Sequence, residues 1–496
     1  MVEAKKQSNT GKAVKGMSSQ TLVTIVLGIA EVLGFSIMSR LLTKEDFGYY
    51  AAITAVTTIF RSFSETGIGA AIIQKKNPDS HYINNAFTIS LMVGCFLSCL
   101  LCVLSRPLSI AVVETPQMTL PLILMSITIL GHCLVSVNTS IMYKRLEFLR
   151  VGVVNLVAFL VSITVEIVLA IKGFGYYAII ARATLHSIVT LILSYILVKT
   201  KFRIEIDKDS FKAIFGFSGW LMASSIIRNL TQEVDKLMMT RLVSIDALGA
   251  YNRPKEFINK IASKLNGIFD TALFPILSDI QDNTQSLRNA LDSSLYYLNI
   301  FGMALGTAFM FNSELVIRIF FGEEWMSLKP LVQIFAFYMI LNVDGRLMDC
   351  YIRSLGKTKK QFHFRVLQLV VTIVGLVIGS KYDLVGIASA IIIANMILVT
   401  IKLLYVTHEI GYKRKLAFMT ILQSWRFVLV LIPFYIIIQI FVENTWSGNL
   451  LSAGIYSLVM FFVFIVFPII VGRKYKYGIY KKIISTIKNK FRVVKY

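Results

Sequence analysis

Charged residues are scarce in this chain. Only 16% of its 496 residues are Asp, Glu, Lys or Arg, whereas 56% are hydrophobic. Soluble domains average about 25% charged residues, so the composition argues against a water-soluble fold, and it also excludes disorder. Acidic residues are the scarcer kind: 28 Asp and Glu residues face 51 Lys and Arg residues, for a net charge of +23. Such an excess is typical of nucleic-acid binding or of the cytoplasmic loops of a membrane protein.

Catalytic and metal-binding motifs are also missing. The five histidines are scattered without ligand spacing and no Walker motif is present, so we expect no metal site and no direct use of ATP. Cys95, Cys99 and Cys102 share one helical face, which we interpret as a packing surface. The segments between apolar runs are shorter than about 30 residues, too short for a catalytic domain of about 50–200 residues. The sequence thus predicts a protein that is not an enzyme and has no cofactor.

Apolar runs long enough to cross a membrane recur along the whole chain. A spanning helix needs about 20 mostly apolar residues, and on this criterion we expect an all-α polytopic membrane protein with about fourteen spans. The expected spans are 18–42, 47–68, 84–104, 117–142, 151–171, 176–198, 211–230, 246–273, 294–311, 328–352, 362–379, 384–406, 427–441 and 450–471.

Lys and Arg side chains indicate which segments stay in the cytoplasm. When the N-terminus is placed inside, basic residues gather in alternate segments, and the tail 472–496 is the most basic of all. This is the asymmetry of cytoplasmic loops, and a missing or spurious span would destroy it. The first apolar run is too long for a cleaved signal peptide. We therefore expect a multi-pass membrane protein with both termini in the cytoplasm and no nucleic-acid partner.

An internal repeat organises the chain. The pattern [ST]-Arg-Leu-[LV]-[ST]-x3-[FL]-Gly-x-Tyr occurs at 39–50 and again at 240–251, and a weaker echo links 174–178 to 385–388. Six spans separate the two copies, so both enter the membrane in the same direction, which is the parallel type of repeat. A duplicated bundle places a cavity between its halves, and rocking of the halves gives alternating access. This favours a transporter over a membrane enzyme.

The repeat divides the chain into six parts. We expect an N-terminal cytoplasmic tail, an N-lobe of six spans, a cytoplasmic linker, a C-lobe of six spans, two further spans and a basic cytoplasmic tail. Their respective bounds are 1–17, 18–198, 199–212, 211–406, 407–471 and 472–496.

Charges within the spans mark candidate functional faces, because ionisable groups in a membrane usually face a bundle interior or water. The eighth span places Arg253, Glu256, Lys260 and Lys264 on one stripe and apolar residues opposite. We interpret it as the lining of an aqueous, cationic cavity; the alternative is a helix lying in the membrane interface. Such a cavity selects anions, and a diphosphate-linked lipid would suit it.

Other spans carry charges with less certain roles. The second span has Arg61 and Glu65, and the seventh has Arg228 near its outer end, followed by Asp235. Glu31 of the first span is either a coupling residue or the structural partner of an arginine. Packing is our default for the remaining charges, which are Glu166, Arg182, Asp344, Arg346 and Asp349.

Two segments resemble a known family. Residues 39–50 resemble the signature of the polysaccharide transporter family, the bacterial flippases for lipid-linked O-antigen and capsule oligosaccharides, as does 229–236 ahead of Gly249 and Tyr251. That family belongs to the superfamily of multidrug exporters and the peptidoglycan-precursor flippase. The resemblance implies fourteen helices, two lobes and a positive cavity that holds the pyrophosphate of an undecaprenyl-linked glycan. By this resemblance, substrate binding falls to Arg61, Arg228, Arg253, Lys260 and Lys264.

The expected function is therefore that of a flippase for surface polysaccharide biosynthesis, with lipid-linked oligosaccharide and membrane lipids as its partners. A polysaccharide polymerase and chain-length machinery remain open as further partners. Coupling to a proton or sodium gradient, through Glu31, Glu65 or Asp235, also stays open. The alternatives are a multidrug exporter, whose cavity should be acidic, and a membrane polymerase or ligase, which should carry a sizeable outer loop.

Overall fold

The structure, a computed structural model, describes residues 23–64, 68–75, 78–200, 202–207 and 226–423, together with residues 425, 433 and 454. Regular secondary structure in these ranges is helical throughout, which confirms the all-α prediction. Nine of the described helices are long and apolar enough to cross a membrane. The expected spans 427–441 and 450–471 and both tails lie outside the described residues, so the total of fourteen stays a prediction.

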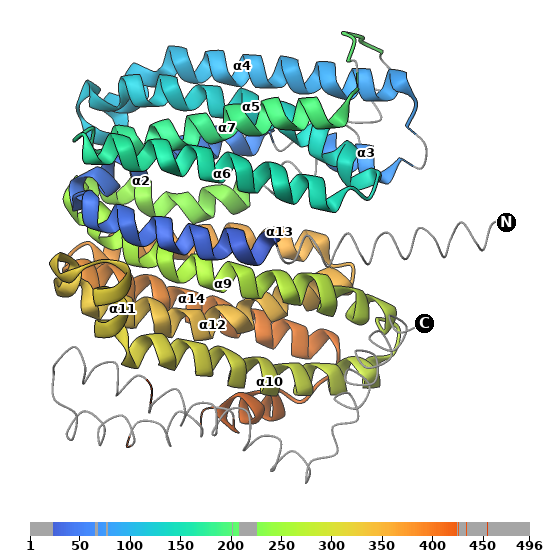
Figure 1. Cartoon of the computed structure of the whole chain (residues 1–496). Helices are drawn as coiled ribbons and strands as arrows, with labels where there is room; N and C mark the ends of the chain where they lie inside the picture. The colour runs from blue at the N-terminus through green and yellow to red at the C-terminus, as the bar shows by residue number, and fades with distance from the viewer. Residues whose placement is uncertain are drawn as a thin grey trace. The chain divides into compact units, whose positions relative to one another are not determined.

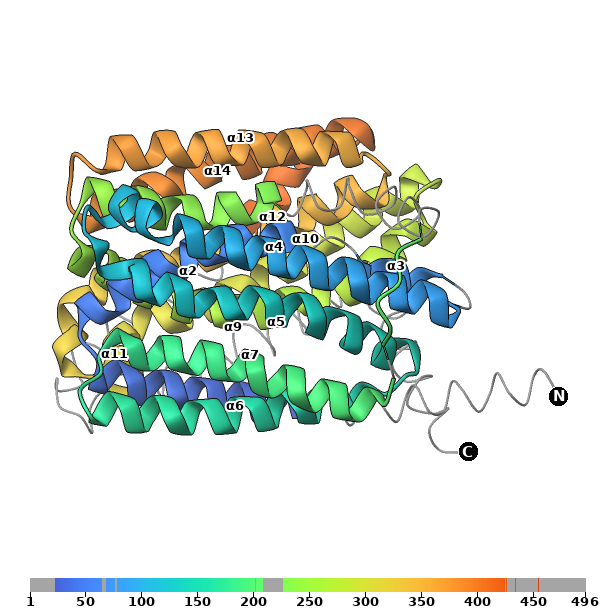
Figure 2. The same ribbon diagram turned by 90° about the horizontal axis from the view of Figure 1, so that it is seen from above.

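The chain divides into two compact units. Unit 1 comprises Met1–Asn252 and Phe320–Gly322. Its long helices include neighbouring pairs that run side by side, α4 with α5 and α6 with α7 (Figures 1 and 2). The described helices of unit 1 are Val23–Leu41, α2 (Lys44–Ser64), α3 (Ile68–Gln74), α4 (Ser80–Val113), η1 (Pro116–Met118), α5 (Thr119–Lys144), α6 (Phe148–Ile171), α7 (Tyr176–Val198), 226–242 and the first turns of α9, from Ile245 to Asn252.

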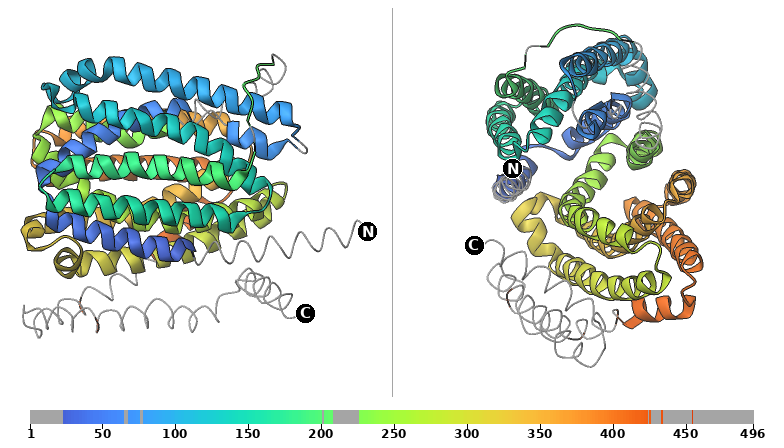
Figure 3. Two further views of the ribbon diagram at one scale, coloured as in Figure 1. Left: turned by 45° about the horizontal axis from the view of Figure 1, so that its top comes forward. Right: turned by 90° about the vertical axis from the view of Figure 1, so that its right-hand side faces the viewer.

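Unit 2 comprises Arg253–Ile319 and Glu323–Tyr496. Its helices α10 and α12 pack together, as do α13 and α14, and Figure 3 shows the helices of each unit in cross-section. The described helices of unit 2 are α9 (Ile245–Asp279) from Arg253 onward, α10 (Thr284–Phe311), α11 (Ser313–Phe320), η2 (Glu323–Leu328), α12 (Lys329–Ser354), α13 (Thr358–Gly379), α14 (Leu384–Glu409) and 414–423.

Each unit has its own apolar core, and apolar side chains also cover its outside. In unit 1, Ile72 and Val137 are fully buried, and in unit 2 Leu291 and Leu295 are. In contrast, Val103 is 75% exposed although it stands in the middle of a long apolar helix. Backbone groups inside a bilayer must be satisfied within a helix, and side chains on its outer face meet lipid. Exposed apolar residues on these helices are therefore the surface that a membrane requires.

Most expected spans coincide with helices, and α7 has the expected bounds 176–198. The helix ends that were predicted wrongly include that of α4, which continues to Val113 instead of ending at residue 104, and two ends that lie in polar turns. The seventh span was expected to end at residue 230, but the helix continues to residue 242, which places Arg228 fourteen residues before that end rather than near it. The ninth span was expected to begin at residue 294, but α10 begins at Thr284, where the Asn283 side chain accepts a hydrogen bond from the Ser286 N–H. In both cases hydrogen bonding continues a helix through polar turns that hydropathy alone excludes.

The two copies of the sequence repeat form equivalent helix starts. One helix ends at Leu41 before α2, and the helix 226–242 ends before α9. The fifth residue of the motif is the N-cap in each copy, because Thr43 Oγ1 accepts from the Asp46 N–H (3.2 Å) and Ser244 Oγ from the Ala247 N–H (3.1 Å). A hydroxyl at this position satisfies a backbone donor that would otherwise lack a partner. The conserved spacing of the motif thus encodes a helix break followed by a capped helix.

The glycine of each motif copy lies directly against the backbone of the other copy. A Cβ at Gly48 would overlap the Ile245 carbonyl oxygen, and a Cβ at Gly249 would overlap the Lys44 carbonyl oxygen. Lys44 and Ile245 occupy equivalent motif positions, so the two contacts exchange when the copies are exchanged. This reciprocity is typical of a twofold contact, here within one chain. Only glycine allows α2 and α9 to approach this closely.

We expect Gly48→Ala and Gly249→Ala each to destabilise the protein by about 1–3 kcal/mol, the usual cost of overpacking. Gly28→Ala is the matched control, because it is also helical and a Cβ there meets no atom within 4 Å. Thermal unfolding of the purified protein in detergent measures the difference. Equal melting temperatures for all three variants would contradict the close backbone contacts of Gly48 and Gly249.

Candidate functional site

Two predicted arginines of unit 1 are brought together by their neighbours. Arg61 is on α2 and Arg228 is on the helix 226–242, and both are exposed within the described part of the chain. The Asn229 amide donates to the Ser62 hydroxyl at 2.9 Å, and both of these residues are buried. The Arg228 Nε donates in turn to Asn229 Oδ1 at 3.3 Å. The Ser62–Asn229 bond therefore fixes the two arginine-bearing turns side by side.

The polar stripe predicted on the eighth span is present on α9. Glu256 lies between two cations, at 3.5 Å from Arg253 Nη1 and 2.9 Å from Lys260 Nζ. Spacings of three and four residues bring side chains together on one helix face. Arg253 is buried, whereas the Lys260 side chain is 37% exposed. The side chain of Lys264 lies outside the described residues.

The opposite face of α9 packs against protein. Phe257 and Ile258 are buried, and the Phe257 ring meets Phe309 of α10 edge-on at 6.1 Å. A helix lying in the membrane interface would instead sink this apolar face among lipid headgroups. The packing on α10 favours the transmembrane reading of α9.

The predicted coupling residues occupy different surroundings. Asp235 is buried and accepts hydrogen bonds from the Tyr251 hydroxyl (3.2 Å) and the Lys236 N–H (2.9 Å). Glu31 belongs to the helix Val23–Leu41, close enough to His186 of α7 for their charges to interact. Glu65 lies outside the described residues.

A buried ion pair in unit 1 goes beyond the packing role assigned from sequence. The Arg182 Nε lies 2.9 Å from Glu166 Oε2, and the Glu166 side chain is only 3% exposed. His186, one turn along α7, lies within electrostatic reach of Arg182 and Glu31. The pair thus links α6 and α7 beside the first helix. Both charges are visible in the sequence, but their pairing across two helices is not.

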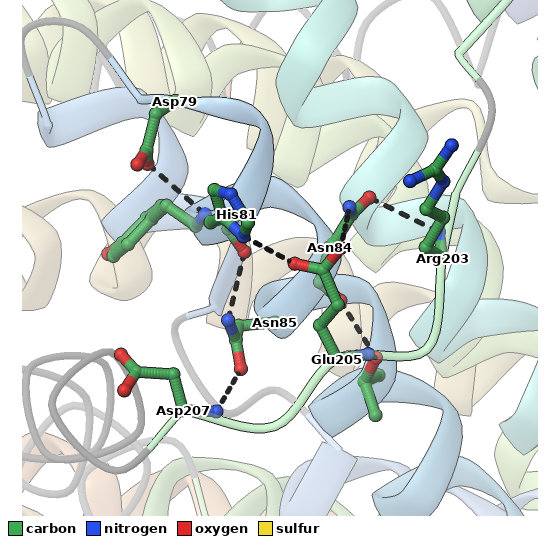
Figure 4. Close-up of polar contacts among 9 residues, drawn as sticks. Asp79, His81, Asn84, Asn85, Arg203, Glu205 and Asp207 are labelled. Atoms are coloured by element: carbon green, nitrogen blue, oxygen red, sulfur yellow. Dashed lines mark hydrogen bonds and ion pairs between the residues drawn. The ribbon is translucent and has the colours of Figure 1, made fainter.

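The beginning of the predicted linker 199–212 is bound to α4 (Figure 4). Three alternate backbone N–H groups, of Arg203, Glu205 and Asp207, donate to Asn84 Oδ1, Thr88 Oγ1 and Asn85 Oδ1 at 3.2, 3.0 and 2.6 Å. The Glu205 carboxylate also accepts from the Asn84 amide and contacts His81 Nδ1 at 2.8 Å. The described residues 202–207 therefore form an extended strap held on unit 1.

The echo motif is held at the start of α2. The Tyr176 N–H donates to Asp46 Oδ1 at 2.8 Å. The Tyr176 ring stacks on Tyr49 at 4.9 Å and on Tyr177 at 4.7 Å. Gly175 takes a positive φ of 55° directly beside the Asp46 carboxylate, where a Cβ would collide. These contacts attach the α6–α7 turn to the break that carries the repeat motif.

The bundle of membrane-length helices, with polar and charged side chains among them, defines this protein as a polytopic all-α membrane protein. Its fold resembles that of the lipid II flippase MurJ in an inward-closed conformation, with a TM-score of 0.70 over 90% of this chain and 98% of MurJ at 15% identity. It also resembles an inward-facing multidrug resistance transporter of the MATE family, with a TM-score of 0.59 over 80% of this chain and 98% of that one at 15% identity. These likenesses show the fold.

The chain belongs to the polysaccharide biosynthesis protein family, which it matches over residues 37–330. It is 23% identical to the lipopolysaccharide biosynthesis protein WzxC of Escherichia coli (strain K12), over 75% of both chains. It is 21% identical to the teichuronic acid biosynthesis protein TuaB of Bacillus subtilis (strain 168), over 72% of this chain and 74% of TuaB. The family resemblance identified in the sequence is thereby confirmed.

We expect Arg182→Met to lower stability strongly, because it leaves the buried Glu166 carboxylate without this partner; breaking a buried pair costs about 3–5 kcal/mol. The double variant Glu166→Leu with Arg182→Met should recover most of the loss, because neither charge then remains buried. Thermal unfolding in detergent compares the single and double variants. If the double variant is less stable than Arg182→Met alone, the ion pair does not account for the contribution of these two residues to stability.

Proposed function

We propose that this protein is a flippase that moves an undecaprenyl-diphosphate-linked oligosaccharide across the bacterial inner membrane for surface polysaccharide biosynthesis. The observation that carries the proposal is the cationic face of α9 in a member of the polysaccharide biosynthesis family. Between Arg253 and Leu273, four basic residues accompany only two acidic ones. Excess positive charge within a membrane attracts an anionic group, and diphosphate is the anion of a lipid-linked glycan.

The arginines and lysines suit a diphosphate chemically. A guanidinium presents a planar fork that binds phosphate oxygens in pairs, and an ammonium acts as a point charge. Arg61 and Arg228, fixed side by side by the Ser62–Asn229 bond, supply forks in unit 1. Of the two cations that flank Glu256 on α9, Lys260 is more exposed than Arg253. Lys260 supplies a point charge in unit 2. Lys264 completes the predicted set on the same stripe.

A multidrug exporter is the less favoured alternative. Cationic cargo calls for carboxylates that face the substrate, but Glu256 is engaged by Lys260 and Arg253, and Asp235 is engaged by Tyr251. A polymerase or ligase should carry a sizeable outer loop. With the N-terminus in the cytoplasm, the longest described connection on the outer side is 312–328, and the short helices α11 and η2 occupy it. This disfavours the enzyme alternative.

The transport step that we propose is alternating access with both termini in the cytoplasm. The chain first passes from unit 1 to unit 2 between Asn252 and Arg253, inside α9 and next to Pro254. Proline removes a helix hydrogen bond and permits bending, so we place the hinge of the cycle there. A polymerase and a chain-length regulator are the expected neighbours that receive the flipped glycan.

We expect the triple substitution Arg253→Gln, Lys260→Gln and Lys264→Gln to reduce flipping at least about tenfold, because hydrogen bonds to charged groups are worth about 1.5–3 kcal/mol each. The assay follows a lipid-linked oligosaccharide across vesicles that contain the purified protein. Lys172, Lys381 and Lys413 are exposed, and their triple Gln variant removes the same charge as a control. Normal flipping in the α9 variant would overturn the site assignment.

A further inference from the structure

A buried carboxyl in the middle of unit 2 is bonded to an amide instead of a cation. Asp344 of α12 and Asn299 of α10 are 7% and 1% exposed, and the Asn299 Nδ2 donates to Asp344 Oδ1 at 2.7 Å. Within the described chain, Asp344 has no ion-pair partner, in contrast to Glu166 and Asp349. Asp344 stands ten residues before the end of α12, about 15 Å along the helix, so it lies well inside a helix of membrane-spanning length.

The orientation of the Asn299 amide is fixed. Its second N–H donates to the Leu295 carbonyl at 2.8 Å, so both amide hydrogens are used. Its oxygen is buried and has no hydrogen-bond partner among the described residues. Reversing the amide would turn this oxygen toward two acceptors, which is unfavourable. Asn299 therefore holds Asp344 through a single directed hydrogen bond.

The charges of the surrounding helices are engaged elsewhere. From α13 and α14, Arg365 and Lys402 bind the two oxygens of Asp349 at 3.0 and 2.8 Å. Arg346 of α12 acts on Asp349 and Lys402. On the η2 side, Glu323 pairs with Arg318 at 3.1 Å. Among the described residues, the side chain that hydrogen-bonds Asp344 is that of Asn299.

An isolated carboxylate in such a place is unstable. Removing an ion from water without a counter-charge is so costly that a buried acid becomes neutral instead. Two ligands neutralise a carboxylate, a proton and a metal cation. Hard cations such as Ca²⁺ take six to eight oxygens, and the side chains of this pair supply only three. A proton needs only one oxygen, which the Asp344 carboxyl supplies while its other oxygen accepts from Asn299.

We propose that Asp344, positioned by Asn299, is a proton-binding carboxyl, and that it takes up and releases one proton in each transport cycle. On uptake, a proton from water forms an O–H bond with the carboxylate; on release, that bond breaks and the proton returns to water. The coupling rests on the proposed flippase function, whereas proton binding does not. The site differs from Glu31, Glu65 and Asp235, the residues that the sequence offered for this role.

Infrared difference spectroscopy of the full-length protein in lipid vesicles tests the binding. The spectrum of the wild type should contain a protonated carboxyl band that disappears as the pH is raised from acid to alkaline. The band should be missing in Asp344→Asn and present in Asp349→Asn, because the ion-paired Asp349 contributes no protonated acid. In Asn299→Leu it should persist to higher pH, since the carboxylate loses its donor. A wild-type spectrum without a titrating band that depends on Asp344 overturns the proposal.

Chemical labelling provides a second measurement that needs no variant. Dicyclohexylcarbodiimide reacts with protonated carboxyls in apolar surroundings, so mass spectrometry of the labelled wild type should find Asp344 modified at acid pH and spared at alkaline pH. An unmodified Asp344 at acid pH contradicts the proposal even if Asp344→Asn fails to fold.

Flipping assays separate the coupling from the proposed function. An imposed proton gradient should change the flipping rate of the wild type, whereas in Asp344→Asn the ratio of rates with and without the gradient should fall to one. If the variant keeps the wild-type ratio, coupling through Asp344 is wrong and the flippase function stands. If the wild type moves no lipid-linked glycan although the Asp344 band titrates, the proposed function fails and proton binding at Asp344 stands.

Discussion

Compensation of charge in a low-dielectric interior is the constraint on which this structure depends. A charge inside the membrane is tolerated only where an opposite charge, a hydrogen bond or water offsets its desolvation. Each buried charge of unit 1 and unit 2 meets this condition differently. Among the described residues, Arg182 pairs with Glu166, two cations share Asp349, and Asp344 is hydrogen-bonded by the Asn299 amide. The polar groups of these helices are therefore organised by where charge can be buried.

Positive charges inside the units are not fully balanced by carboxylates, and this excess of positive charge bears on function. Cations exceed carboxylates on α9, where Glu256 lies between Arg253 and Lys260, and the same is true around Asp349. A membrane protein with surplus positive charge on its polar faces is suited to an anionic cargo. Both proposals follow from the need to compensate charge: surplus cations bind the diphosphate of a lipid, and the Asp344 carboxylate binds a proton.

Sequence reasoning succeeded where local spacing determines contact. The apolar run at 176–198 predicted the bounds of α7, helical spacing placed Arg253, Glu256 and Lys260 on one face of α9, and the repeat motif marked two equivalent helix breaks. It failed at the end of the helix 226–242, because hydropathy measures suitability for lipid and not backbone hydrogen bonding. It also could not find Ser62–Asn229 or Asn299–Asp344, whose partners lie on different helices and meet only through tertiary packing.

The most direct test of the account is the affinity of the reconstituted protein for a polyprenyl-diphosphate oligosaccharide, compared with the same glycolipid lacking its phosphates. If intramembrane cations hold the diphosphate, two charge-assisted hydrogen bonds predict at least about a hundredfold tighter binding of the phosphorylated lipid, and Gln at Arg61 and Arg228 should reduce that preference. Equal affinity for the two lipids would contradict the central claim that positive charge within the membrane recognises the substrate.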